Sequence, residues 1–200
     1  MARIDHYFAT GLYRAALPSA RNAALRKVCL SIAADDSAGR RWSSKHAYRG
    51  YTSYASLNDL PLRAPEFADL QKRIDVHVAR FARLLDFDLG RKRLRLDSMW
   101  INVLETGGVH GGHIHPHSAI SGTFYVSVPK GTSTIRFEDP RLPLMMAAPP
   151  RKERAKPHNR SHVSVTPAPG NLLLWESWLR HDVSVNQARA PRISISFNYS

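Results

Sequence analysis

The stretch RISISFN, residues 192–198, presents two different surfaces on one predicted strand. Side chains alternate along a strand, so Ile193, Ile195 and Phe197 share one face. The opposite face is polar and consists of Arg192, Ser194, Ser196 and Asn198. A simple sheet would leave this polar face in water, whereas a barrel can turn it inward as a polar cavity. The strand therefore favours a barrel whose apolar outside is covered by other elements.

The same period of two recurs through the second half of the chain. Segments bounded by Gly and Pro predict seven strands, at residues 94–105, 121–129, 133–140, 162–167, 170–177, 181–185 and 192–200. Many short strands at this spacing are typical of a sandwich or barrel. The proline-rich segment 140–160 predicts a long loop.

The first ninety residues are predicted to be mainly helical. A helix-start signal stands at Pro18-Ser19, and a second helix is predicted from Pro65, with Glu66 in its first turn. The second helix has one apolar face, formed by Leu70, Ile74, Val78, Phe81 and Leu85. Residues 43–65 predict a structured loop. We expect one α+β domain over 1–200, with a mainly helical flank at 1–90 packed outside an all-β core at 94–200.

Composition restricts the class of protein. Hydrophobic residues make up 43% and charged residues 22%, as in ordinary folded proteins. No apolar run approaches the roughly 20 residues of a membrane span, and the N-terminal stretch has no apolar core of a secretory signal. Cys29 is the only cysteine, so an internal disulfide and a cysteine-based zinc site are excluded. We expect a cytoplasmic protein in which histidine and carboxylate are the available metal ligands.

The formal net charge of +13 is compatible with an anionic partner or substrate, either a small molecule or a peptide. A solvated basic surface explains the charge more simply, because the excess is spread along the chain. Aromatic and basic residues do not interleave as a base-stacking platform requires, so nucleic acid is not supported as a partner. The oligomeric state stays open.

A cluster of histidines lies in ETGGVHGGHIHPHSAISGTFYV, residues 105–126. On an extended segment His113 and His115 project to the same side, as two adjacent ligands of one metal would. His115 and His117 have the same spacing, so the local sequence does not decide between the pairs. Two histidines separated by one residue are weak evidence for a metal site by themselves.

A distant histidine strengthens the metal hypothesis. His181 begins a predicted strand, and ten residues separate it from Arg192. The intervening segment predicts a turn, so the strands at 181–185 and 192–198 are expected to pair and to place both side chains in one cavity. Arginine offers a planar fork of donors for a carboxylate, and Ser194 adds a hydroxyl on the same face.

These motifs together resemble the 2-oxoglutarate- and iron(II)-dependent oxygenases, and most closely a bacterial subgroup of that superfamily. The similarity covers residues 80–200 well and the N-terminal helices more loosely. It rests on WIN at 100–102, HIHP at 113–116, SGTFYV at 121–126, FEDPR at 137–141, PG at 169–170, SWLRHDV at 177–183 and RISISFN at 192–198. The resemblance implies a double-stranded β-helix, or jelly-roll, core.

The resemblance also implies roles for particular residues. His113, His115 and His181 would bind Fe(II). The distal carboxylate of the cosubstrate 2-oxoglutarate would be bound by Arg192, Ser194 and Tyr125, with Asn102 pointing into the same cavity. His110 would lie beside the ligands or face the substrate. The implied activity couples oxidative decarboxylation of 2-oxoglutarate to the oxidation, expected to be hydroxylation, of a substrate that the sequence does not identify.

One position departs from the pattern of the superfamily. Most members have Asp or Glu where this chain has His115, which gives two histidines and one carboxylate. Three neutral imidazoles leave the +2 charge of iron(II) unreduced, which should alter its redox potential. No carboxylate is expected to substitute, because Asp182 should point away from His181 and Glu105 lies too far upstream.

Two alternatives remain at this point. A cupin-like metalloenzyme with three histidines would not use 2-oxoglutarate, although the glutamate expected just after the HxH motif is missing, with Ala119 and Ile120 in its place. A non-catalytic basic binding module would need no active metal. Metal analysis separates the module from the enzymes, and dependence on 2-oxoglutarate separates the two enzymes.

Overall fold

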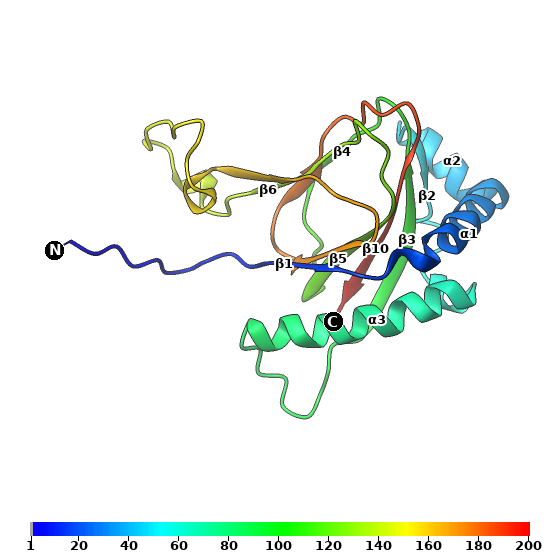
Figure 1. Ribbon diagram of the computed structural model, residues 1–200, viewed down its shortest axis with the longest axis horizontal. Helices are drawn as coiled ribbons and strands as arrows, with labels where there is room; N and C mark the ends of the chain where they lie inside the picture. Colours follow the sequence, from blue (N-terminus) through cyan, green and yellow to red (C-terminus); the bar gives the residue numbers. More distant parts are fainter. Residues whose placement is uncertain (1) are drawn as a thin grey trace.

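The structure is a computed structural model that describes residues 2–200 and contains two antiparallel sheets with helices beside them (Figure 1). The helices are α1 (Asn22–Asp35), α2 (Ser37–Lys45) and α3 (Pro65–Leu84). The strands are β1 (Leu12–Ala16), β2 (Gly50–Thr52), β3 (Leu96–Leu104), β4 (His110–His113), β5 (Ile120–Ser127), β6 (Ile135–Glu138), β7 (His162–Val165), β8 (Asn171–Glu176), β9 (His181–Val183) and β10 (Arg192–Tyr199).

The two sheets face each other as the halves of a jelly roll. The larger sheet has the order β1-β8-β5-β10-β3-β2, and the smaller sheet has the order β4-β9-β6-β7. β10 lies inside the larger sheet, where it pairs with β3 on one side and β5 on the other. Its polar face therefore looks into the space between the sheets. This arrangement is the double-stranded β-helix that the sequence predicted.

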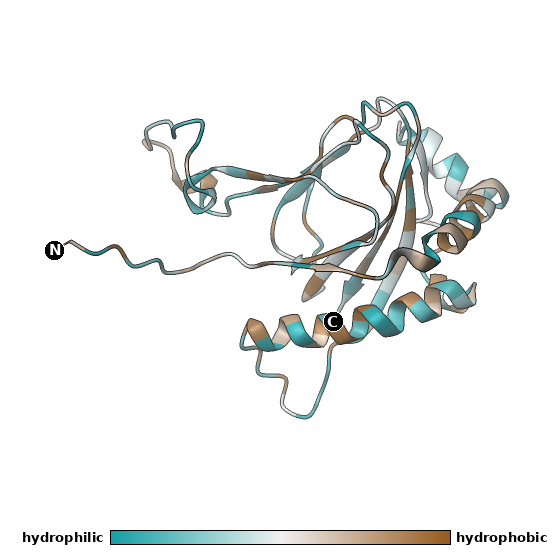
Figure 2. Ribbon diagram, viewed as in Figure 1, coloured by the Kyte–Doolittle hydropathy of each residue, from teal (hydrophilic) through white to brown (hydrophobic). Residues whose placement is uncertain are grey.

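The opposite face of β10 belongs to the main core. Ile193, Ile195 and Phe197 are almost fully buried there, together with the inward face of α3. Pro65 occupies the first turn of α3, where its missing N–H costs no hydrogen bond. Polar and apolar residues alternate along this helix as expected for a helix with one buried side (Figure 2). The helices thus cover the apolar outside of the larger sheet.

The structure confirms the seven predicted strands and the two predicted helices, with shorter ends. It adds β1, β2, β4 and α2, which the sequence did not predict. β4 is rich in glycine, and β2 is only three residues long, so neither shows an alternating pattern. α2 is mostly polar, and it begins where the Asp36 side chain accepts a hydrogen bond from the Gly39 amide at 2.9 Å.

The expected pairing between the strands at 181–185 and 192–198 is wrong. β9 pairs with β4 and β6 in the smaller sheet, whereas β10 belongs to the larger sheet. The segment between them crosses from one sheet to the other instead of making a hairpin. Asn186 fixes part of this crossing, because its side chain donates hydrogen bonds to the Leu104 and Glu105 carbonyls. His181 and Arg192 still share a cavity, because their strands face each other across it.

Within residues 2–200, no helix has both the length and the apolar character needed to cross a membrane.

The two faces of β10 predict losses of stability of different size when neighbouring positions are changed to alanine. Ile195→Ala removes a fully buried side chain from the core and should lower the free energy of unfolding by about 2–5 kcal/mol. Ser196→Ala removes one acceptor of an Asn102 hydrogen bond on the cavity side and should cost about 1 kcal/mol. Urea unfolding of both variants measures the difference. Equal losses would show that β10 does not separate a core from a cavity.

Candidate metal centre

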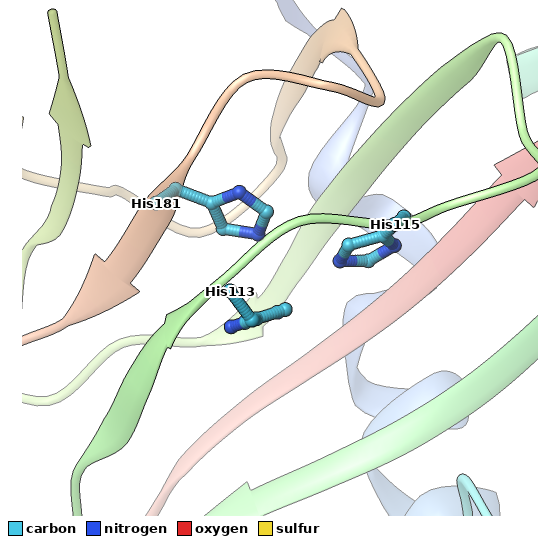
Figure 3. A group of neighbouring side chains, drawn as sticks. All are labelled: His113, His115 and His181. Carbon is cyan, nitrogen blue, oxygen red and sulfur yellow. The ribbon is translucent and has the colours of Figure 1, made fainter. Parts of the chain in front are cut away.

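Three histidines converge between the two sheets. His113 stands at the end of β4, His181 at the start of β9, and His115 in the loop that follows β4 (Figure 3). One ring nitrogen from each lies within 4.8 Å of the other two. The ring centroids of His113 and His181 are 4.4 Å apart, and both are 5.1 Å from that of His115. The structure therefore brings together the three residues that the sequence selected.

Hydrogen bonds fix the orientation of all three rings. Nδ1 of His113 lies 2.7 Å from the Gly111 carbonyl, and Nδ1 of His181 lies 2.9 Å from the Leu179 carbonyl. Nδ1 of His115 lies 2.6 Å from Oδ1 of Asn198. Each of these oxygens can only accept, so each Nδ1 carries the proton and donates. The lone pair is then on Nε2 in every ring, which is the atom left for a metal.

The protonation state also suits metal binding. Burial, with a smaller contribution from the charge of the neighbouring His113, lowers the pKa of His115 to about 4 and that of His181 to about 3. Both rings are therefore neutral at physiological pH, which is the form that coordinates metals. Nε2 of His115 is buried and has no hydrogen-bond partner among the described residues. An unpartnered acceptor in this place fits a metal ion.

The other residues considered from the sequence lie outside the cluster. His110 stacks against His113 at 4.9 Å and lines the cavity without joining the cluster. His117 is exposed and has a φ of 72° in the turn beyond. Asp182 points outward and pairs with Arg136 at 2.7 Å. Among residues 2–200, the cavity beside the cluster is lined by no Asp or Glu.

Arg192 is buried in the same cavity without a counterion. Its side chain is only 4% exposed, and no ion pair joins it to a carboxylate in the described part of the chain. One guanidinium nitrogen donates to Oγ of Ser133 at 3.0 Å, while Nε is buried and unpartnered. An unpaired charge in such a place is costly, so this arrangement fits an anionic ligand.

Polar groups on three adjacent strands surround this arginine. Ser194 on β10 lies opposite Tyr125 on β5 and opposite Asn102 on β3. The guanidinium lies 5.6 Å from the centre of the Tyr125 ring, and burial raises the pKa of Tyr125 to about 12. The Asn102 amide accepts a hydrogen bond from the Thr52 hydroxyl at 2.9 Å and donates one to Oγ of Ser196 at 3.0 Å. These neutral donors can add hydrogen bonds to a carboxylate at Arg192.

Two further residues were not assigned from the sequence. Asn198 appeared only as part of a polar strand face, but it holds His115 and also accepts a hydrogen bond from Ser121 at 2.8 Å. Tyr48 lies in a segment that was predicted to be a loop, so no sequence signal marked it. Its ring contacts His110 edge-on at 5.5 Å, and its buried hydroxyl has no partner. Burial raises the pKa of Tyr48, and the charge of Arg192 partly opposes this.

Comparisons with known proteins agree with this geometry. Residues 98–198, half of the chain, match the profile of the family described as "Putative 2OG-Fe(II) oxygenase". A search of curated proteins found no significant match.

Several solved structures share the fold. A prolyl-4-hydroxylase from Pseudomonas putida is 17% identical, with a TM-score of 0.63 over 95% of this chain and 92% of that chain. The non-heme alpha ketoglutarate dependent carbocyclase SnoK from nogalamycin biosynthesis is 14% identical, with a TM-score of 0.64 over 95% of this chain and 79% of that chain. HygX from Streptomyces hygroscopicus, crystallised with nickel and 2-oxoglutarate, is 17% identical, with a TM-score of 0.58 over 96% and 82%.

The matched segment runs from β3 to β10 and contains all three clustered histidines and the buried arginine. The chain belongs to the 2-oxoglutarate- and iron(II)-dependent oxygenase family, and it is an oxidoreductase that uses both iron(II) and 2-oxoglutarate.

Proposed function

We propose that His113, His115 and His181 are the iron ligands of this oxygenase. Their Nε2 atoms face one another, and their Nδ1 protons are all committed to fixed acceptors. The metal, when bound, supplies the activation of O₂ that is coupled to decarboxylation of 2-oxoglutarate. The chain supplies three imidazole ligands, oriented by hydrogen bonds, in a cavity between two sheets.

We further propose that Arg192 binds the carboxylate of 2-oxoglutarate that lies away from the metal. The observation that carries this role is a buried guanidinium with no counterion in residues 2–200 and with an unpartnered Nε. Ser194 and Tyr125 lie beside it as neutral donors, and Asn102 lies on β3, the neighbour of β10 on the side opposite β5. A planar fork with two bonds to a carboxylate would align the cosubstrate along the polar face of β10.

The two alternative functions account for less of the site. A cupin-like enzyme that does not use 2-oxoglutarate would give no reason for a buried arginine without a counterion. A binding module with no active metal would give no reason for three imidazoles whose protons are all directed away from a common point. Both features are explained together when a metal and a dicarboxylate occupy the cavity.

We propose that the protein works in the cytoplasm and that residues 1–200 form one domain. The only thiol, Cys29, is fully buried in the core, and burial raises its pKa to about 12. Its burial is compatible with a reduced compartment, although it does not require one. α1 and α3 pack on the same larger sheet that carries Arg192, which supports a single folding unit.

Removing a ligand should abolish metal binding without unfolding the protein. His181→Ala and His115→Ala should each weaken Fe(II) binding by more than about a hundredfold, because loss of an outer partner alone typically costs 10–100-fold. His117→Asn is the matched control, since Asn tolerates the φ of 72° at that position. Anaerobic titration and metal analysis measure the effect. Full iron occupancy in His181→Ala would overturn the ligand assignment.

The Asn198 amide should act through the orientation of His115. Asn198→Leu removes the acceptor for Nδ1 and should weaken Fe(II) binding by about 10–100-fold. Asn198→Asp keeps an acceptor in place and should retain the affinity within about tenfold. Equilibrium dialysis with Fe(II) under nitrogen distinguishes the two variants. Similar losses in both would contradict the role of the acceptor at position 198 in orienting His115.

Arg192 should control the affinity for 2-oxoglutarate and not that for the metal. Arg192→Ala removes a charge-assisted contact worth about 1.5–3 kcal/mol, so the dissociation constant should rise at least about tenfold. Arg192→Lys should recover only part of the affinity, because an ammonium cannot form the fork. Calorimetry on the oxygen-free, iron-loaded protein measures both, with iron content as the control. An unchanged affinity in Arg192→Ala would contradict the assignment.

A further inference from the structure

The cavity beside the histidines has an aromatic path to the surface. Trp100 lines the cavity with its ring 5.9 Å from that of His115. Tyr54 contacts Trp100 edge-on at 5.3 Å and is itself 54% exposed. The ring centroid of Trp42 on α2 lies 6.4 Å from that of Tyr54 and 4.1 Å from that of His46, on which it stacks. These rings form a rim, defined here as Trp42, His46, Tyr54 and Trp100, that leads from solvent to the metal centre.

The segment that carries Trp42, His46 and Tyr54 of the rim is basic. Residues 37–58 contain Arg40, Arg41, Lys45 and Arg49 and no Asp or Glu. Arg40 is engaged at the end of α1, where it donates to the Ala33 carbonyl at 3.0 Å. The other three side chains are exposed and take part in no ion pair within the described residues. Arg41 and Lys45 are four residues apart on α2, so they form a cationic row beside the Trp42–His46 row.

A free strand edge lies next to this rim. β4 is the last strand of the smaller sheet, and β2 is the last strand of the larger sheet. The two edges meet where Tyr48, just before β2, contacts His110 at the start of β4. In residues 2–200, no backbone–backbone hydrogen bond joins Gly111, Gly112 or Ile114 to a segment outside β9, although the Gly111 carbonyl already accepts a hydrogen bond from Nδ1 of His113. Figure 1 shows α2, β2 and β4 at the same end of the molecule.

The two glycines of β4 differ in their surroundings: Gly112 is covered by the Arg180 guanidinium, which an added Cβ would meet at 2.8 Å, whereas Gly111 is uncovered. A Cβ built on Gly111 would meet nothing within 4 Å, so the face of β4 is open at this residue. Exposed strand edges bind extended peptides through main-chain hydrogen bonds, and positions without side chains allow a close approach. The free edge ends at His113, which is a residue of the metal cluster.

We propose that the substrate is an extended, acidic polypeptide that pairs with the free edge of β4. Its acidic side chains face Arg41, Lys45 and Arg49, and one of its side chains passes Tyr54 and Trp100 to reach the histidine cluster. The inference rests on the proposed function and names the substrate class of the same site. A nucleic acid fits less well, because a phosphodiester backbone cannot pair with a strand edge, and His46 already covers one face of Trp42.

Fluorescence anisotropy with the full chain tests the proposal through binding alone. The probe is a labelled peptide of alternating glutamate and alanine at low ionic strength, because exposed charges are screened by salt. Arg41→Gln/Lys45→Gln should weaken binding by about tenfold, the combined effect of two exposed ion pairs. The matched control is Arg91→Gln/Lys92→Gln, which removes the same charge in the turn before β3 and should change binding less than about twofold. Thermal melting verifies that both variants are folded.

A second pair of probes separates edge pairing from charge. The same peptide with alternate amides N-methylated keeps its charge but loses half of its main-chain donors, and it should bind about tenfold more weakly. Equal binding of both peptides, or equal losses in the two protein variants, would overturn the proposal. Tighter binding of a single-stranded oligothymidylate of equal charge, lost in Arg41→Gln/Lys45→Gln, would assign the surface to nucleic acid instead.

The outcome is distinguishable from failure of the ligand assignments. The binding assay needs neither turnover nor 2-oxoglutarate, so a negative result leaves the roles of Arg192 and the histidines unaffected. Peptide binding by a protein that takes up no 2-oxoglutarate would support the docking surface and overturn the proposed role of Arg192.

Discussion

The alternation of side chains along β10 is the constraint on which the rest of the structure depends. The strand is hydrogen-bonded on both sides, by β3 and β5, so its register cannot slip without turning every side chain to the wrong face. One face joins the core beneath α3, and the other carries Arg192 at one end and Asn198 at the other. A single strand therefore fixes both the proposed cosubstrate anchor and the residue that orients His115.

The electrostatics of the cavity follow from its ligand set. Three neutral imidazoles bring no negative charge, so a divalent metal and the Arg192 guanidinium together place three positive charges in a buried space. The two carboxylates of 2-oxoglutarate offset two of these, and one positive charge remains. In enzymes with a carboxylate ligand the same sum is zero. The remaining charge should favour an anionic group near the metal. The exposed Arg41, Lys45 and Arg49 side chains would favour an anionic substrate as well.

Much of this fold could be predicted from alternation and helical periodicity, and the failures have physical causes. β4 contains two glycines and two histidines, and it is recognisable only once β9 is placed beside it. The pairing of β9 with β10 was wrongly expected because a short polar segment resembles a hairpin turn, whereas here it crosses between sheets. The histidine cluster and Arg192 were predictable because the jelly roll directs them into one cavity from either sheet.

Other parts of the site could not be predicted because they depend on tertiary contacts. Asn198 is one more polar residue on its strand until His115 is seen to donate to it at 2.6 Å. Tyr48 belongs to a segment without periodicity, and its position at His110 results from the way β2 closes the larger sheet. The aromatic rim joins Trp42 and Tyr54, which are twelve residues apart, to Trp100 on β3, which lies 46 residues beyond Tyr54.

The cavity also links ligand binding to stability. Nε2 of His115, Nε of Arg192, the Tyr48 hydroxyl and the Trp175 indole N–H are all buried without hydrogen-bond partners in the described residues. A buried polar group that stays without a partner costs about 1–3 kcal/mol, so ligands that pair with these groups are favoured. A metal and a dicarboxylate bind the folded state through some of these same groups, so they raise the free energy of unfolding by an amount set by their concentrations relative to their dissociation constants. β10 and the helices behind it thus fix the shape of this polar cavity, and the fold gains stability when ligands bind there.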